Sequence, residues 1–236
     1  MSETSTRLKQ TPAAVLFDLD GCLIDTAPDF HRVVNLQRER YQRAPLDYSQ
    51  VRPVVSSGAR ALIGLSFGID DSHHSYSEKR QELLDLYLEF IRVDSQLFEG
   101  LEAVIESIER KGIKWGIVTN KPRVYAEALL KAMEQDIQCG VLVCPDDVSR
   151  TKPDPEPLFL ASQLLGVEPS ACWYLGDHVR DIQAGNAAGM LTIATAYGYV
   201  DAGEDPAAWD ADLCIHTPDE LLGFLEALPH ESGAPH

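Results

Sequence analysis

The chain has 236 residues, 44% of them apolar, which allows one large globular domain or a core with a modest insertion. Its 37 acidic and 20 basic residues give a net charge of -17, which argues against nucleic acid and membrane surfaces as partners. The five cysteines are scattered without a Cys-x-x-Cys pair, and no apolar stretch has the length of a signal segment or a membrane span. We therefore expect a soluble, cytoplasmic protein with reduced thiols.

The first stretch that carries chemistry runs from Asp18 to Thr26 and follows the apolar run 15–17, which predicts a short buried strand. Asp18 and Asp20 lie two residues apart and would share one face at the carboxyl end of this strand, where Gly21 lets the backbone turn away. Two neighbouring carboxylates repel each other, so a cation is expected between them. Because no His or Cys accompanies the pair at ligand spacing, Mg²⁺ is favoured over zinc.

The next segment, residues 27–95, has helical periodicity over most of its length. Apolar residues recur at helical intervals over 28–41, 59–67 and 78–93. Only 51–55 suggests a strand, and Pro53 interrupts it. We therefore predict an all-helical insertion.

From residue 96 onward, strand and helix patterns alternate, which is typical of a parallel sheet with crossover helices. Strands are predicted at 114–118, 141–143, 172–175, 191–195 and 213–215, with helices at 101–111, 124–133, 157–165, 179–188 and 218–227. The fold class expected is α/β, a Rossmann-like doubly wound parallel sheet. Residues 1–26 and 96–228 would form this core, 27–95 a helical domain, and 229–236 a disordered tail.

Three further polar clusters follow predicted strands. Thr119 and Asn120 come directly after the strand 114–118, Lys152 stands before a proline-rich helix start, and Asp177 follows the strand 172–175, with Asp181 four residues on. Taken singly, each cluster has an ordinary structural explanation. Thr119 and Asn120 could form a turn, Lys152 could face solvent, and the two aspartates could cap a helix. All of them fall at or beyond the carboxyl ends of strands, which predicts one shared site.

The order Asp-x-Asp, Thr, Lys, Gly-Asp-x-x-x-Asp resembles motifs I to IV of the haloacid dehalogenase-like hydrolase superfamily. The stretch 18–26 departs from motif I only at Cys22, where Thr is usual. The resemblance implies the α/β core of that superfamily, Mg²⁺ as cofactor and hydrolysis of a phosphate monoester. It also implies a metal site made by Asp18, Asp177 and the backbone carbonyl of Asp20.

The residues suit phosphoryl transfer through an aspartyl-phosphate. Asp18 is the expected nucleophile and Asp20, protonated at rest, the general acid and base. Lys152 would screen the charge of the phosphate, and Thr119 with the Asn120 backbone would bind its oxygens. Asp181 would hold a metal-bound water or orient Lys152.

The helical insertion resembles the C1 cap of the superfamily, which closes over the site and reads the leaving group. In its segment 56–60, Ser57 and Gly58 would permit close approach of a substrate, and Arg60 would bind a carboxylate; the alternative is an ordinary surface arginine. Within the superfamily the chain resembles the phosphoglycolate phosphatase branch. Five pieces of the sequence are most similar to the bacterial N-acetylmuramic acid 6-phosphate phosphatases of that branch: the cap segment 57–60, the segments 143–147, 152–157 and 197–199, and Trp209. The expected partner is therefore a small phosphate ester, either N-acetylmuramic acid 6-phosphate or 2-phosphoglycolate.

Two other functions fit parts of the pattern. A phosphosugar mutase would use the same core and return the phosphoryl group to a sugar. A phosphoacceptor switch protein would also place Asp, Thr and Lys on a doubly wound sheet, but an insertion of about 70 residues would serve no purpose there. The sequence does not decide between phosphatase and mutase, and it does not indicate an oligomeric state.

Overall fold

The computed structural model describes residues 6–133, 137–201 and 203–229. Its main sheet has six strands, all paired in parallel, in the order β5-β4-β1-β6-β7-β8 within these residues. The strands are β1 (Ala14–Phe17), β4 (Lys114–Val118), β5 (Leu142–Val143), β6 (Cys172–Gly176), β7 (Leu191–Thr195) and β8 (Leu213–Ile215). The predicted α/β class with a doubly wound parallel sheet is confirmed.

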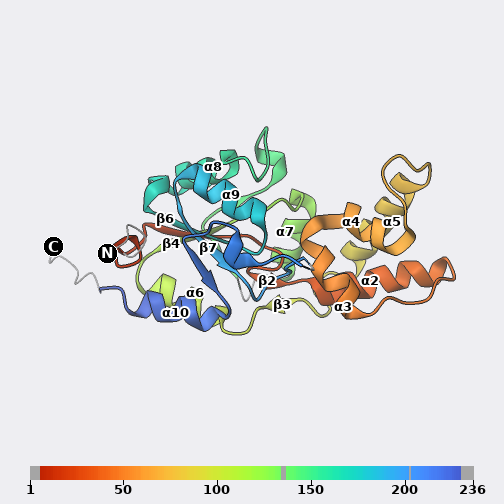
Figure 1. Cartoon of the computed structure of the whole chain (residues 1–236), viewed down its shortest axis with the longest axis horizontal. Helices are drawn as coiled ribbons and strands as arrows, with labels where there is room; N and C mark the ends of the chain where they lie inside the picture. The colour runs from red at the N-terminus through yellow and green to blue at the C-terminus, as the bar shows by residue number, and fades with distance from the viewer. Residues whose placement is uncertain (1–5, 134–136, 202, 230–236) are drawn as a thin grey trace.

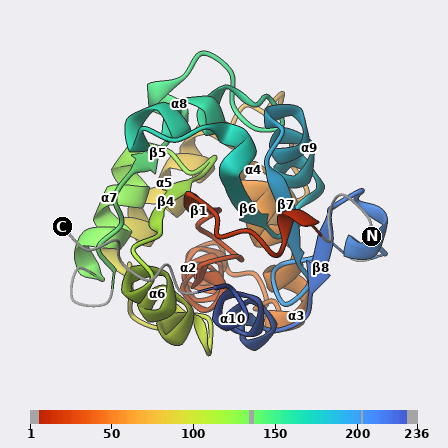
Figure 2. The ribbon, with the colours of Figure 1, turned by 90° about the vertical axis from the view of Figure 1, so that its left-hand side faces the viewer.

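Helices cover both faces of this sheet, as Figure 2 shows. Val15 and Phe17 of β1 belong to a buried cluster with α6 (Leu101–Arg110), α7 (Arg123–Ala132) and α10 (Pro218–Glu226). Ala14 and Leu16 point the other way, because side chains alternate along a strand, and pack with α8 (Glu156–Leu165) and α9 (Val179–Ala188). Both faces of β1 are therefore buried, which explains its continuous apolar sequence.

The helices between residues 27 and 95 pack together in a lobe beside the sheet (Figure 1). They are α2 (Ala27–Arg40), α3 (Tyr48–Val51), the 3₁₀ helix η1 (Arg52–Ser57), α4 (Gly58–Phe67) and α5 (Tyr76–Glu89). Their buried cluster includes Phe30 and Tyr87, whose rings stack with centroids 4.3 Å apart. The chain leaves and re-enters the core through β2 (Ile24–Asp25) and β3 (Gln96–Leu97), which pair antiparallel.

Residues 51–55, the one stretch of this segment that suggested a strand, are helical, in agreement with the predicted all-helical insertion. Val51 ends α3 and Val55 lies in η1, and both valines, four residues apart, are buried in the helical lobe. The helix expected over 78–93 ends at Glu89; Arg92 beyond it has a positive φ of 59°, and the side chain of Val93 is exposed.

The remaining short 3₁₀ helices are η2 (Pro145–Asp147), η3 (Pro169–Ala171) and η4 (Pro206–Ala208). Most of the tail expected at 229–236 lies outside the described residues. Within the described part of the chain, no helix has the length and apolar character needed to cross a membrane.

Candidate active site

The carboxyl ends of three adjacent strands bring the predicted site residues together. Phe17 of β1 is in register with Ile117 of β4 on one side and with Leu175 of β6 on the other. Asp18 lies one residue beyond Phe17, whereas Thr119 and Asp177 lie two residues beyond Ile117 and Leu175, and all three side chains are buried. Segments about 100 and 160 residues apart in the sequence therefore meet at one edge of the sheet.

Tight turns support this edge. Gly21 has a φ of 83°, and a Cβ atom there would lie 1.9 Å from Oδ2 of Asp177. At Gly198 a Cβ atom would lie 2.3 Å from Cβ of Asp177 and 2.4 Å from the Gly21 carbonyl oxygen. Only glycine fits at either position, because any side chain would displace a buried carboxylate.

Lys152 lies at the centre of the site and is only 3% exposed. Its Nζ lies 2.9 Å from Oδ1 of Asp18 and 2.6 Å from Oδ1 of Asp181, and it donates to the Val118 carbonyl and the Tyr174 hydroxyl. Burial alone would lower the pKa of Lys152, but the two carboxylates raise it above its usual value. Lys152 therefore remains a cation, and Asp181 is placed to orient it.

Asp18, Asp177 and Asp181 form a buried acidic cluster, with one oxygen from each lying within 4.8 Å of the others. Burial raises the pKa of Asp18 to about 6, against the lowering effect of Lys152. It raises the pKa of Asp177 to about 8, and the charges of Asp18 and Asp181 add to that rise. Three carboxylates thus face a single ammonium group, which leaves an excess of negative charge.

This cluster fits a divalent cation. Oδ1 of Asp177 is buried and has no hydrogen-bond partner among the described residues. A buried oxygen without a partner is costly, and a hard cation bound by carboxylate oxygens would satisfy it and balance the excess charge. The acidic cluster can therefore hold a metal ion.

Asp20 lies outside the acidic cluster and forms an ion pair that the sequence reasoning missed. Its Oδ1 lies 2.8 Å from Nζ of Lys121 and accepts a hydrogen bond from the Thr26 hydroxyl at 2.6 Å. Asp20 thus lies in contact with a cation, and its expected role as general acid and base stays a prediction. The one available sequence signal was that Lys121 directly follows Thr119 and Asn120.

Lys121 also joins the core to the helical lobe. Its side chain is 7% exposed, and its Nζ lies 5.0 Å from the ring centroid of Phe30 and 4.5 Å from that of Tyr87. Burial would lower the pKa of Lys121, but Asp20 and the Tyr87 hydroxyl raise it. The ammonium group is therefore held between a carboxylate of the core and two rings of the lobe.

Thr119 and Asn120 occupy the expected place beside Asp18 and Lys152. The Thr119 hydroxyl oxygen accepts a hydrogen bond from the Lys121 backbone N–H at 3.1 Å, which leaves its own O–H free to donate. The Asn120 side chain donates to the Lys152 carbonyl at 3.0 Å. Thr119 can therefore bind an anion, while the Asn120 side chain fixes the segment that carries Lys152.

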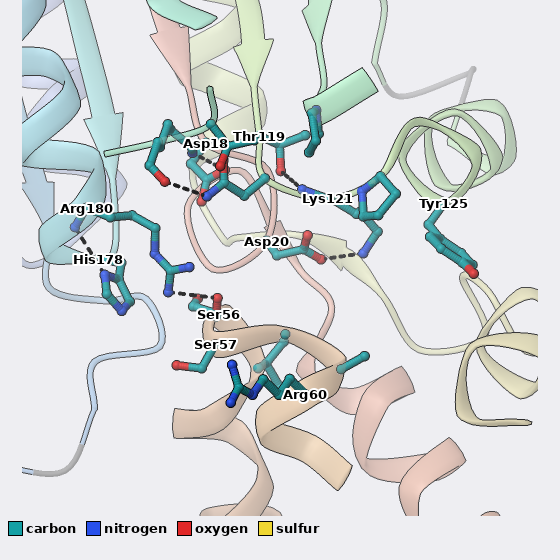
Figure 3. Close-up of a pocket in the computed structure, with 18 of the residues that line it drawn as sticks. Asp18, Asp20, Ser56, Ser57, Arg60, Thr119, Lys121, Tyr125, His178 and Arg180 are labelled. Atoms are coloured by element: carbon teal, nitrogen blue, oxygen red, sulfur yellow. Dashed lines mark hydrogen bonds and ion pairs between the residues drawn. The ribbon is translucent and has the colours of Figure 1, made fainter. Parts of the chain in front are cut away.

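A cavity of about 460 Å³ lies between these groups at the sheet edge and the helical lobe (Figure 3). Ser57, Gly58 and Arg60 line it from the lobe, as expected. Arg60, however, is at the exposed rim: its side chain is 69% exposed and pairs with Asp71 at 3.2 Å. Its place beside the cavity agrees with the prediction, and its contact with substrate stays a prediction.

Three cavity residues had not been assigned a role from the sequence. The Ser56 hydroxyl donates to Oδ2 of Asp177 at 2.8 Å, and the Ser56 carbonyl accepts from the Arg180 guanidinium at 3.1 Å. His178 caps α9 by accepting the Arg180 backbone N–H at its Nδ1. Arg180 and His178 stand beside Asp177 and Asp181 in the sequence, and this adjacency was the available signal.

Tyr199 links the acidic cluster to the start of the helical lobe. Its backbone N–H donates to Oδ2 of Asp177 at 2.9 Å. Its buried hydroxyl accepts from the Ala27 backbone N–H at 2.8 Å and donates to Asp25 at 2.6 Å. The position of Asp177 is therefore fixed from the point where the chain leaves the core.

Known proteins with similar sequences place this site in a family. Residues 12–189 match the family model of the haloacid dehalogenase-like hydrolases. The chain is 44% identical over 213 residues to the N-acetylmuramic acid 6-phosphate phosphatase of Pseudomonas aeruginosa, covering 90% of this chain and 94% of that protein. It is 38% identical over 214 residues to a phosphoglycolate phosphatase of Xanthomonas campestris pv. campestris, covering 89% and 95%.

A solved structure shares the fold. The structure titled as a predicted phosphoglycolate phosphatase from Haemophilus somnus 129pt superposes with a TM-score of 0.79 at 20% identity, covering 91% of this chain and 98% of that one. The strand-end acidic cluster, the buried lysine, and the matches in sequence and fold agree with one another. The chain therefore belongs to the haloacid dehalogenase-like hydrolase family, as an enzyme of the phosphoric monoester hydrolase class.

Proposed function

We propose that this protein is a Mg²⁺-dependent phosphatase that hydrolyses a small phosphate monoester through an aspartyl-phosphate on Asp18. The observation that carries the proposal is the placement of Asp18 at the floor of the cavity, 2.9 Å from the Lys152 ammonium. A carboxylate approaches a doubly charged phosphate only when nearby cations screen the repulsion. Lys152 supplies such a charge at the attacking group.

In the first half of the reaction, a carboxylate oxygen of Asp18 forms a bond to phosphorus as the bond to the leaving oxygen breaks. Asp20 gives its proton to the departing alkoxide, and the alcohol leaves. Thr119 donates its free O–H to a phosphate oxygen, and Lys152 neutralises charge that develops there. Since Asp20 is paired with Lys121 here, this step requires the substrate anion to take over the Lys121 ammonium and leave Asp20 free to carry a proton.

In the second half, a water molecule attacks phosphorus, and Asp20 takes its proton. The bond between phosphorus and Asp18 breaks, which releases inorganic phosphate and restores both carboxyl groups to their starting forms. The same residue thus serves as acid and then as base. No proton or phosphoryl group is left over after a full cycle.

Mg²⁺ would be held by Asp18, Asp177 and the backbone carbonyl of Asp20, with Asp181 close by. When bound, it would supply positive charge to the phosphate oxygens. Oxygen ligands alone suit Mg²⁺, and the unpartnered Oδ1 of Asp177 supports a cation at this point.

We further propose that residues 27–95 act as a cap that covers the site and reads the alcohol part of the substrate. Relatives named above act on N-acetylmuramic acid 6-phosphate and on phosphoglycolate, and both compounds carry a carboxylate as well as a phosphate. A cavity of about 460 Å³ has room for more than a two-carbon acid. We therefore rank N-acetylmuramic acid 6-phosphate first and 2-phosphoglycolate second.

The proposal is tested by measuring phosphate release with Mg²⁺ from these two substrates, from glucose 6-phosphate and from p-nitrophenyl phosphate. We expect many turnovers per enzyme molecule without a bisphosphate activator. A single burst equal to the enzyme concentration would indicate a phosphoacceptor switch. Dependence on a sugar bisphosphate, with the phosphoryl group returned to sugar, would indicate a mutase.

A further inference from the structure

Five cationic side chains line the cavity, and they differ in whether a carboxylate already engages them. Three have an acidic partner: Lys152 with Asp18 and Asp181, Lys121 with Asp20, and Arg60 with Asp71. For Arg80 and Arg180 the described residues place no carboxylate oxygen within 4.0 Å of the guanidinium group. Among the described residues, these two arginines are therefore the cavity cations that no carboxylate of the protein already pairs with.

Arg180 is the better positioned of the two. It belongs to the first turn of α9, and the His178 side chain accepts its backbone N–H at 3.1 Å. One of its guanidinium N–H groups donates to the Ser56 carbonyl at 3.1 Å. For Arg80, which comes from α5, the described residues give no comparable anchor. Figure 3 shows the Arg180 side chain crossing from the sheet edge toward Ser56.

The contact with Ser56 holds the Arg180 guanidinium group near the acidic cluster. Ser56 binds Arg180 through its carbonyl and Asp177 through its hydroxyl, at 3.1 and 2.8 Å. Ser56 thus bridges Arg180 and Asp177 of the acidic cluster, on the side of the cavity where the core meets the lobe. A guanidinium group has five N–H donors, and four are left after the Ser56 contact.

We propose that Arg180 binds a carboxylate on the alcohol part of the substrate and so sets the preference for carboxylated phosphate esters. This inference rests on the proposed phosphatase function. Arg180 is half-buried and has no acidic partner among the described residues, whereas Arg60 is exposed and pairs with Asp71. A charged contact is stronger where water is partly excluded and where no other carboxylate competes for it.

The test compares two substrates that differ in one carboxylate-bearing group. N-acetylmuramic acid 6-phosphate and N-acetylglucosamine 6-phosphate share the phosphate and the sugar, but only the first carries the lactyl carboxylate. We expect Arg180→Ala to lower the ratio of their kcat/KM values roughly 10- to 150-fold, mostly through the KM of the carboxylated substrate. Arg180→Lys should recover only part of that ratio, because an ammonium group cannot make the bidentate contact that a guanidinium group makes with a carboxylate.

Matched arginine variants serve as controls. Arg110→Ala removes a surface arginine that pairs with Glu226 outside the cavity, and the ratio should not change. Arg60→Ala and Arg80→Ala should each keep most of the ratio. Thermal melting of every variant, with and without Mg²⁺, checks that the fold and the metal site are intact.

Several outcomes would overturn the inference. One is an unchanged ratio in a folded Arg180→Ala, with or without a collapse in Arg60→Ala or Arg80→Ala. Another is a parent enzyme that hydrolyses both sugar phosphates equally well, which would leave the phosphatase proposal standing. A parent that releases no phosphate from any ester, p-nitrophenyl phosphate included, would instead reject the proposed function itself.

Discussion

The floor of the cavity, at the sheet edge, and its roof, on the helical lobe around Arg60, differ in how far their charged side chains are buried. On the floor, Asp18, Lys152 and Asp181 are buried, and Lys152 alone contacts two carboxylates, a carbonyl and a hydroxyl. On the roof, Arg60 is mostly exposed and its partner Asp71 is 55% exposed. Buried charges have few alternative positions, while exposed ones are screened by water. Substitutions at the floor should therefore reduce activity strongly, whereas substitutions at the roof should have small effects on activity and stability.

The largest effect is expected at Asp18. Asp18→Asn should lower kcat more than about 10⁴-fold, because an amide is neither a nucleophile nor a good magnesium ligand. The buried floor should remain folded, since the replacement has the same shape. Steady-state phosphate release together with circular dichroism checks both points. Activity within tenfold of the parent would mean that another residue is the nucleophile.

Removing the metal should be nearly as severe, since the excess negative charge of the acidic cluster would then face the phosphate. We expect EDTA to lower kcat more than about 10³-fold and Mg²⁺ to restore it. Ca²⁺ should fail, because it accepts more ligands and looser geometry than the cluster needs for reaction. Full turnover with Ca²⁺, or in EDTA, would contradict the assignment of a Mg²⁺ site.

Asp20→Asn should have an effect that depends on the leaving group. General acid help is worth roughly 10²- to 10⁴-fold, and only a leaving oxygen that needs a proton benefits from it. A sugar phosphate should therefore lose far more activity than p-nitrophenyl phosphate, whose phenolate leaves unaided. Measuring kcat/KM for both esters on the variant decides this. Equal losses would exclude Asp20 as the acid.

The raised pKa values at the floor predict how Mg²⁺ stabilisation depends on pH. The pKa values of Asp18 and Asp177 are about 6 and about 8 in the folded protein, above their unfolded values. Their contribution to metal-free stability is therefore present at low pH and lost as pH rises through these values. Mg²⁺ needs the ionised carboxylates, so the melting temperature should rise more with Mg²⁺ at about pH 8.5 than at about pH 5.5.

We expect that difference to be a few degrees, since each tenfold change in Kd is about 1.4 kcal/mol, which shifts the melting temperature by about 3 to 6 °C for a chain of this size. Differential scanning fluorimetry over the pH range measures it. Asp177→Asn is the matched control, and its Mg²⁺ shift should be small at every pH. A larger shift at acid pH in the parent protein would mean that protons and Mg²⁺ do not compete at this cluster.

The smallest effect is expected at the roof. Asp71→Ala breaks the pair with Arg60, and exposed pairs contribute little, so the free energy of unfolding should change by about 0.5 kcal/mol or less. The kcat/KM values should stay within about threefold of the parent. Urea unfolding and the substrate panel measure both. A loss of about 2 kcal/mol or more would show that the roof is as tightly constrained as the floor.

The sequence predicted the elements of the core better than those of the lobe. The predicted strands 114–118, 191–195 and 213–215 have the observed bounds. The first two are buried over nearly their whole length, and a strand buried on both faces has a mostly apolar sequence. In the lobe, the helix predicted over 78–93 ends at Glu89, and Val93 beyond it is exposed. The apolar pattern runs past the observed end of this helix, so the local sequence did not indicate where the helix stops.

The candidate site shows the same limit. Asp18, Thr119, Lys152 and Asp177 were predictable because each follows a strand, and parallel strands end at one edge of the sheet. Lys121 was missed because its partner Asp20 is 101 residues away and a lone lysine is usually solvated. The contact between Arg180 and Ser56 spans 124 residues and depends on how the lobe sits on the core.

The position of Lys121 means that the surroundings of Asp20 are complete only where the core and the lobe meet. Asp20 and Lys121 both come from the core, while the rings of Phe30 and Tyr87, which keep water from the ammonium, come from the lobe. Two charges about 4 Å apart attract with about 1 kcal/mol in bulk water and about 4 kcal/mol at the effective dielectric of a protein surface. The strength of this pair thus depends on how the two parts meet, and a core without its lobe would keep both Asp20 and Lys121 but would expose their ion pair to water.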